Sequence, residues 1–324
     1  MREVPRFQLC VAVLALVVLG GAQRAFAQAP PPDAATSAAR ALAAAKSWGY
    51  QLQKIDPDTL AAAPYDVIVI DYSRDGSDAR ALTADEVRRL KTRPDGGRRV
   101  VLAYLSVGEA EKYRYYWQED WETSALAPPW LTEPNKRYRT NFPVRYWQAD
   151  WQAIVFRGDN SYLGRILNAG FDGIYLDRVD VHEEFAKENP AAAEQMPAFV
   201  KALAAHARSL RPGFLVVPQN GEELLEAASY RAVIDGIAKE DLLFGAGRSK
   251  HPNSQEQIDT GAGHLKLMTR DHKPVFVVEY LDNAQDIVNA RTRIEEYGFI
   301  PHFASRALNR MRIGDLPDPP AKRR

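Results

Sequence analysis

Short runs of apolar residues recur along this chain, and several of them end abruptly in a carboxylate. A continuous, β-branched apolar run is typical of a strand that is buried on both faces. Eight segments fit this pattern: 48–53, 67–72, 100–106, 173–177, 214–220, 234–240, 275–279 and 299–304. The spacing between them leaves room for helices, so the sequence predicts an α/β fold, a (β/α)8 TIM barrel.

Two of the intervening helices carry boundary signals. Thr83 is followed three residues later by Glu86, which is a capping box and predicts a helix start. A second helix is expected over 196–210, where Arg211-Pro212-Gly213 ends it.

One connection is far longer than a single helix requires. Residues 107–169 separate the third and fourth predicted strands, and long connections are commonly functional. This aromatic-rich insertion holds five of the six tryptophans, namely Trp117, Trp121, Trp130, Trp147 and Trp151. Aromatic faces stack on sugar rings, so Trp117 and Trp147 are expected to contact a saccharide. The alternative is that these aromatic residues pack the insertion onto the barrel.

The N-terminus has the features of a secretory signal peptide over 1–27. Arg2 and Arg6 precede an apolar stretch that is too short to span a membrane, and Ala25-Phe26-Ala27 supplies a cleavage site. A linker over 28–44, the barrel over 45–312 and a flexible tail over 313–324 are expected to follow. The sequence therefore predicts a secreted or periplasmic monomer without membrane insertion after cleavage.

Composition excludes several classes of partner and chemistry. The only cysteine, Cys10, lies in the signal peptide, so the mature chain lacks disulfides, thiolate nucleophiles and cysteine metal ligands. Lys and Arg number 42, as do Asp and Glu, and this balance gives no basic footprint for nucleic acid or an anionic membrane.

Acidic residues gather at predicted strand ends. Asp71, Asp177, Glu240 and Glu279 each end an apolar run, and in a parallel barrel the carboxyl ends of the strands meet at the catalytic face. Converging carboxylates are typical of glycoside hydrolysis. The alternative for each acid alone is a cap of the following helix or turn.

Other chemistries fit the sequence poorly. It holds no Gly-x-Ser-x-Gly elbow, no glycine-rich phosphate loop and no His-Glu-x-x-His motif. Asp177, Asp180 and His182 are an alternative metal site, but their spacing matches no standard cage. We therefore expect no metal and no cofactor.

Three segments at strand ends carry a family resemblance. Residues 70–76 (IDYSRDG), 103–111 (AYLSVGEAE) and 170–177 (GFDGIYLD) resemble the signature blocks of glycoside hydrolase family 114. That family includes endo-α-1,4-polygalactosaminidases. The resemblance implies a TIM barrel acting on a polysaccharide of α-1,4-linked galactosamine. It also implies a catalytic acid pair on the fourth and sixth strands.

On this sequence the pair falls on Asp177 and Glu240, with Glu222 after the fifth strand as a rival for the second position. Asp177 would be the ionised nucleophile, and Glu240, with its pKa raised, the general acid. Other strand-end residues would bind sugar hydroxyls or an amino group: Asp71, Tyr72, Tyr104, Ser106, Asn220, Glu279 and Tyr280. Glu109 is expected either to bind substrate or to start a helix.

Two functions remain open at this point. The first is a secreted glycoside hydrolase, and the second is a non-catalytic carbohydrate-binding barrel for an exported polysaccharide. The sequence also leaves open endo or exo action, and retention or inversion at the anomeric carbon.

Overall fold

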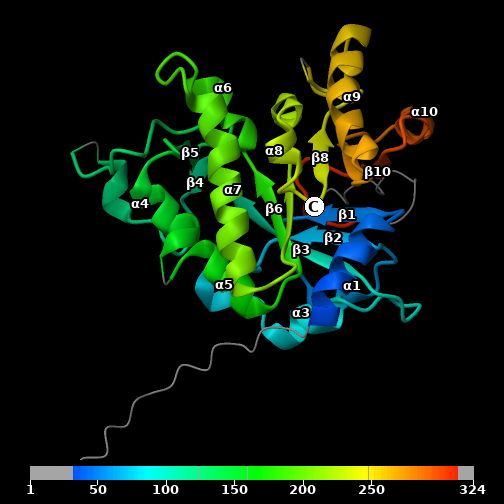
Figure 1. Cartoon of the computed structure of the whole chain (residues 1–324), viewed down its shortest axis with the longest axis horizontal. Helices are drawn as coiled ribbons and strands as arrows, with labels where there is room; N and C mark the ends of the chain where they lie inside the picture. Colours follow the sequence, from blue (N-terminus) through cyan, green and yellow to red (C-terminus); the bar gives the residue numbers. More distant parts are fainter. Residues whose placement is uncertain (1–31, 124, 159, 247, 313–324) are drawn as a thin grey trace, which may run out of the picture.

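The computed structural model describes residues 32–123, 125–158, 160–246 and 248–312, and shows parallel strands that alternate with helices (Figure 1). The signal peptide expected over 1–27 and the tail expected over 313–324 lie outside the described residues.

Eight strands form the barrel. Five of them make one parallel sheet in the order β1 (Trp48–Gln51), β2 (Val67–Ile70), β3 (Val100–Ser106), β6 (Gly173–Asp177) and β7 (Leu215–Pro218). The other three are β8 (Ile237–Glu240), β9 (Val275–Glu279) and β10 (Ile300–Phe303), paired in that order.

Two seams join these sheets into a barrel. Between β7 and β8, Gln219 and Ala238 form a parallel bridge, and Asp235 N donates to Val216 O at 2.8 Å. Between β10 and β1, Trp48 Nε1 donates to Ile300 O at 3.0 Å. The TIM-barrel prediction is confirmed. Each of the eight predicted segments contains a strand, and 100–106, 173–177 and 275–279 have the predicted bounds.

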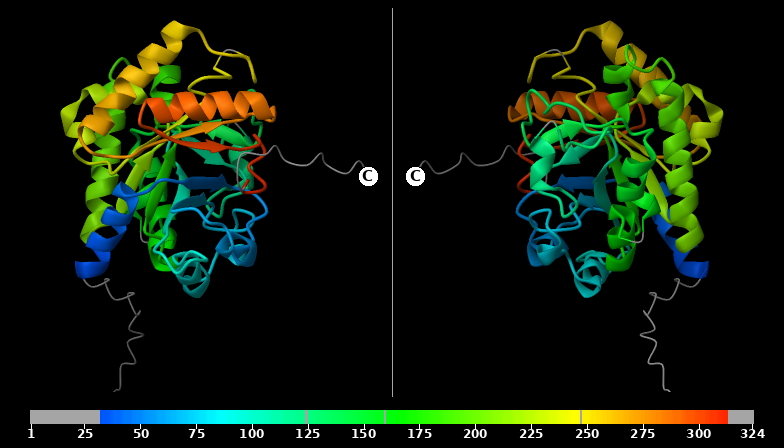
Figure 2. Two further views of the ribbon diagram at one scale, coloured as in Figure 1. Left: turned by 90° about the vertical axis from the view of Figure 1, so that its right-hand side faces the viewer. Right: turned by 90° about the vertical axis from the view of Figure 1, so that its left-hand side faces the viewer.

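Helices surround the strands, as the side views of Figure 2 show. They are α2 (Pro57–Ala61), α3 (Ala84–Leu90), α5 (Tyr162–Ala169), α7 (Ala192–Leu210), α8 (Ala228–Arg231), α9 (Gln255–Arg270) and α10 (Ala284–Glu296). The capping box is present at α3, where the Thr83 side chain accepts from Glu86 N and the Glu86 side chain accepts from Thr83 N. The helix predicted over 196–210 starts earlier, at Ala192.

The segment 28–44 requires a correction. It was expected to be a linker, but residues 32–43 form helix α1. Ala38, Leu42 and Ala45 are buried in the same cluster as the inward side chains of the strands, among them Val67. Within α1, Ala38 and Leu42 are four residues apart and so lie on one side of the helix, and alanine has the highest helix propensity. Since α1 ends just before β1 begins, it lies at the N-terminal end of the barrel.

The insertion after β3 forms its own small unit. β4 (Glu109–Glu111) and β5 (Asn141–Pro143) pair antiparallel, and α4 (Ala149–Gln152) continues into a π-helical turn over Ala153–Arg157. Trp121, Trp130 and Trp151 are buried. Ring contacts connect Trp121 to Trp130 and Trp130 to Trp151. These aromatic residues therefore pack the insertion together.

Candidate active site

Polar side chains from neighbouring strands line a cavity of about 390 Å³ at the carboxyl ends of the barrel strands. Asp177 is the last residue of β6, and Glu240 is the last residue of β8. Gln219 follows β7 directly, between them. The fold thus brings the two acids of the predicted pair to one cavity, which lies at the end of a barrel where active sites form.

The side-chain amide of Gln219 joins the two acids. Its Nε2 donates to Asp177 Oδ1 at 3.0 Å and to Glu240 Oε2 at 2.8 Å. These two carboxylate oxygens therefore lie no farther apart than the sum of the two distances. The two carboxyl groups are therefore close enough to act on one glycosidic bond.

Asp177 accepts two further hydrogen bonds. The Tyr104 hydroxyl donates to Oδ2 at 2.7 Å, and the backbone N–H of Arg178 donates to Oδ1 at 2.8 Å. Arg178 has a φ of 65°, a left-handed conformation that is unusual for a side chain of this size. A Cβ on Gly108 would lie 2.2 Å from Arg178 O, so only glycine allows the chain after β3 to approach this turn.

Glu240 is held from two other strands. The Tyr280 hydroxyl, just after β9, donates to Oε1, and Asn220 Nδ2 lies 3.4 Å from Oε2. Asn220 Oδ1 also accepts the backbone N–H of Glu240 at 3.1 Å. Asn220 is itself left-handed, with a φ of 62°, a region that asparagine tolerates better than most residues.

Burial raises the pKa values of both acids. Desolvation, together with the nearby charge of Glu240, raises the pKa of Asp177 to about 8. Desolvation also raises the pKa of Glu240, and the charge of Asp241 raises it further. Because each shift favours a neutral carboxyl, the pair is suited to hold one proton near neutral pH.

A buried ion cluster lies beside this pair. Arg114 Nη2 lies 2.7 Å from Asp71 Oδ2, and Arg114 Nε lies 2.6 Å from Glu111 Oε2. Glu111 Oε1 accepts from the Tyr113 hydroxyl and lies 3.4 Å from that of Tyr104. Asp71 therefore lines an adjoining cavity, which it shares with Tyr104, Tyr113 and Arg114.

Gln219, Glu111 and Arg114 were missed as site residues by the sequence analysis. Glu111 could have been found, because Glu109 and Glu111 alternate with Ala110 and so point to one side of a strand. Both glutamates do line the cavity. Arg114 carries no such signal, since it reaches the cluster from a turn in the insertion.

Glu109 is buried and occupies the first position of β4, so the alternative that it starts a helix is wrong. Asn135 Nδ2 donates to it at 2.7 Å and Asn141 Nδ2 at 3.2 Å. Arg178 Nε lies 3.1 Å from Glu109 Oε1. Glu109 thus lines the cavity and links the turn after Asp177 to the insertion.

Three expected site residues from the barrel strands line neither of these two cavities. Tyr72 is buried and donates to Asp78 Oδ1 at 3.1 Å. Ser106 Oγ accepts from Glu109 N at 3.2 Å. Glu279 is fully buried, its pKa is raised to about 8 by desolvation, and it accepts from Leu243 N at 2.7 Å. These residues hold the loops around the site.

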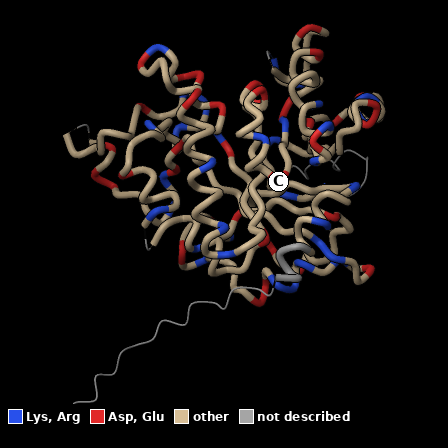
Figure 3. The backbone as a smooth tube through the Cα atoms, viewed as in Figure 1, with Lys and Arg blue, Asp and Glu red and all other residues tan. Residues whose placement is uncertain are grey.

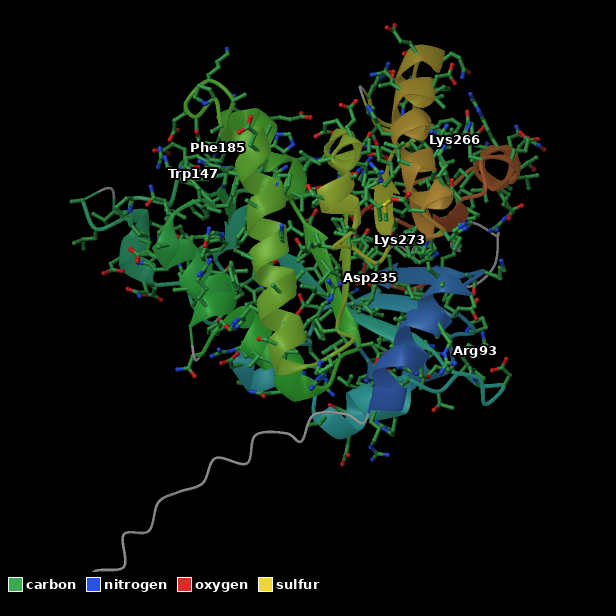
Figure 4. All side chains as sticks on the ribbon, viewed as in Figure 1. Arg93, Trp147, Phe185, Asp235, Lys266 and Lys273 are labelled. Carbon is green, nitrogen blue, oxygen red and sulfur yellow. The ribbon has the colours of Figure 1, made fainter. Side chains whose placement is uncertain are left out.

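Trp117 and Trp147 also lie away from the cavity. Trp117 packs on Phe142, with ring centroids 4.6 Å apart, and both tryptophans pack against the outer hydrophobic core. Trp147 makes an edge contact with Phe185 at 5.2 Å, and Figure 4 shows the two side by side. The aromatic residues that do line the cavity from the insertion are Tyr113 and Tyr138, which are 45% and 50% exposed.

Glu222, the rival for the second acid, points elsewhere. Its Oε1 lies 3.1 Å from Lys239 Nζ, and it lines none of the strand-end cavities that hold Asp177 and Glu240. Since successive side chains of a strand alternate, Lys239 and Glu240 face opposite sides of β8. The geometry therefore favours Glu240.

The alternative metal site does not assemble. His182 Nε2 lies 2.8 Å from Glu223 Oε1, while Asp180 lies 3.6 Å from Arg178 Nη1. Within the described part of the chain, no group of three His, Cys, Asp or Glu side chains could hold a metal ion.

An eight-stranded α/β barrel with a close carboxylate pair at the ends of its fourth and sixth strands has the arrangement of a glycoside hydrolase. Residues 28–315 match the model of glycoside-hydrolase family GH114, and the chain belongs to this family. The family prediction is therefore confirmed, and membership supports glycoside hydrolase activity.

Relatives from several organisms share most of the chain. An uncharacterised protein of Thermotoga maritima is 35% identical over 271 residues, which are 80% of each chain. An uncharacterised protein of Deinococcus radiodurans is 33% identical over 88% of this chain and 90% of its own. The glycoside hydrolase domain of PelA from Pseudomonas aeruginosa has the same fold, with a TM-score of 0.62, 19% identity and coverage of 82% of this chain and 97% of that domain.

Proposed function

We propose that this protein hydrolyses a polysaccharide of α-1,4-linked galactosamine, with Asp177 and Glu240 as the catalytic carboxylates. The observation that carries this proposal is the joint contact of both acids with Gln219, in a cavity at the strand ends. Membership of family GH114, which includes endo-α-1,4-polygalactosaminidases, supports this class of polymer as the substrate.

Both acids accept hydrogen bonds that favour the ionised form against the effect of burial: Asp177 from Tyr104, Gln219 and the backbone N–H of Arg178, and Glu240 from Gln219 and Tyr280. The pair therefore shares one proton, and Asp177 acts as the nucleophile when that proton is on Glu240. It would attack the anomeric carbon while Glu240 gives its proton to the departing glycosidic oxygen. Water would then displace Asp177 from the sugar, and Glu240 would take the proton of that water. The anomer of the first product tests this retaining route against inversion.

The lining of the cavity suits an amino sugar. Five acids line it, namely Glu109, Glu111, Asp177, Asp180 and Glu240, against three arginines, Arg137, Arg178 and Arg306. A protonated sugar amine is attracted to this excess of acids. Tyr113 and Tyr138 offer exposed rings at its rim for stacking on sugar faces. In the view of Figure 3, acidic and basic residues are interspersed along the described chain.

We also propose that the protein is exported through the signal peptide at 1–27 and acts as a monomer outside the cytoplasm. Among the residues that the structure describes, no helix is long and apolar enough to cross a membrane. N-terminal sequencing of protein exported by a bacterial host, with size-exclusion chromatography coupled to light scattering, tests both points.

The direct test is incubation of residues 28–324 with α-1,4-linked galactosamine polymer in its N-acetylated and deacetylated forms, followed by mass spectrometry. A β-1,4-linked glucosamine polymer serves as the matched control. Short oligosaccharides from the deacetylated α-linked polymer alone are the expected result. Binding without products would favour the non-catalytic carbohydrate-binding barrel instead.

A further inference from the structure

The side chain of Gln219 occupies a central position that no other residue of the cavity shares in the described structure. It is 2% exposed, and its single amide nitrogen contacts both acids. We propose that Gln219 is the positioning residue of the pair, fixing the separation of Asp177 and Glu240 and stabilising whichever of them is charged. This inference rests on the proposed function and adds a residue to it.

The orientation of the amide is determined by Tyr175 on β6. The Tyr175 hydroxyl donates to Gln219 Oε1, and the Tyr175 ring is fully buried in the barrel interior. A reversed amide would lose this bond and turn its oxygen toward two carboxylates. The contact with Tyr175 therefore keeps the N–H groups directed at Asp177 and Glu240.

The backbone of Gln219 is anchored to both neighbouring strands. Its N–H donates to Leu176 O at 2.8 Å, one residue before Asp177. Its other side forms the parallel bridge with Ala238, two residues before Glu240. The same short segment thus sets the side chain between the two strand ends, and a shift of the Gln219 backbone would require both contacts to change.

This position has a consequence for the reaction. In the retaining route the negative charge starts on Asp177 and moves to Glu240 as the glycosidic bond breaks. An amide that already donates to both oxygens stabilises the charge before and after the step without moving. Fixed donors of this kind are the main source of electrostatic catalysis.

The test replaces Gln219 with methionine, which keeps the length of the side chain and removes both donors. We expect kcat to fall by about 10²-fold or more, the range for loss of a preorganised donor, with a smaller change in KM. The acidic limb of the pH–rate profile should move to higher pH, because the ionised carboxylates lose a donor. Gln152→Met, on α4 in the insertion, is the matched control and should keep the wild-type profile.

Tyr175→Phe provides a second variant that retains Gln219 but frees its amide. It should shift the acidic limb in the same direction by a smaller amount. A wild-type rate and an unmoved acidic limb in folded Gln219→Met would overturn the inference while the proposed function stands. If Gln219→Met does not fold, an unmoved limb in Tyr175→Phe overturns it equally.

A readout without turnover separates the two proposals. Carboxyl 13C NMR titrations, assigned with Asp177→Asn and Glu240→Gln, follow the pair directly. If the wild type cleaves no polymer but Gln219→Met raises the midpoints of both carboxyls, Gln219 positions the pair and the proposed function fails. Unchanged midpoints would reject the role of Gln219 whatever the activity.

Discussion

Arg114 holds Asp71 in a two-pronged ion pair, with Nη1 3.0 Å from Oδ1 and Nη2 2.7 Å from Oδ2. Arg114 belongs to the insertion, and Asp71 follows β2 at the barrel mouth. Through its Nε the same guanidinium also contacts Glu111, so one buried cation joins two buried acids. The cluster thus fastens the insertion, including the Tyr113 side of the cavity, to the barrel.

Removing this cation should be costly. Arg114→Met leaves Asp71 and Glu111 buried without their counter-charge, and breaking a buried pair in this way costs about 3–5 kcal/mol of unfolding free energy. Arg88→Met is the matched control, because Arg88 and its partner Asp85 are 73% and 83% exposed and such pairs contribute little. Guanidinium unfolding curves measure the free energy of unfolding of both variants. Equal stabilities of the two variants would show that the Arg114 cluster does not stabilise the fold.

The catalytic pair should make stability depend on pH. Asp177 has its pKa raised to about 8 in the folded state, whereas an unfolded aspartate titrates near ~3.9. The folded state therefore binds the proton more tightly, and stability is lost as pH rises between these two values. Burial also raises the pKa of Glu279 to about 8, so its titration likewise lowers stability as pH rises.

Asp177→Asn removes one of these titrations. Its stability relative to the wild type should increase from pH 4 to pH 8 and level off above, as measured by thermal unfolding in a buffer series. Asp58→Asn, at a side chain that is 79% exposed, is the control and should follow the wild type across the series. A constant difference between Asp177→Asn and the wild type would refute the raised pKa.

The aromatic residues of the insertion should divide into two groups. Tyr138 lines the cavity and is half exposed, so Tyr138→Ala should raise KM several-fold and leave the melting temperature nearly unchanged. Trp117 packs on Phe142 and Trp121, so Trp117→Ala should cost at least ~2 kcal/mol of stability with little change in KM. If Trp117→Ala instead raised KM and left the melting temperature unchanged, Trp117 would be a saccharide contact.

The proposed route has a stereochemical outcome. In this route Asp177 attacks the anomeric carbon directly, with Gln219 in contact with both acids, and this double displacement retains the anomeric configuration. Proton NMR of the earliest products should then show the α-anomer first, followed by mutarotation. First appearance of the β-anomer would mean inversion, with a water between the two acids.

The barrel was largely predictable because strands that are buried on both faces appear in the sequence as continuous apolar runs. Asp177 and Glu240 stand at the ends of two such runs, so their position at strand ends was predictable too. Helix α1 was missed because its Ala38 and Leu42 face is short and follows a proline-rich stretch. Gln219 was missed because a neutral amide after a strand has no sequence signal of its role. That role depends on the side-chain contacts with Tyr175 and both acids, which only the folded chain brings together.

The most direct test of the catalytic assignment is the rate of reducing-end release from deacetylated α-1,4-linked galactosamine polymer by three nearly isosteric variants. Asp177→Asn and Glu240→Gln should each lose at least ~10²–10⁴-fold in kcat, the range for loss of a catalytic acid or base, and should still bind the polymer. Glu222→Gln, whose carboxylate pairs with Lys239, should retain most of the activity. Near-wild-type turnover by Glu240→Gln together with an inactive Glu222→Gln would contradict the assignment.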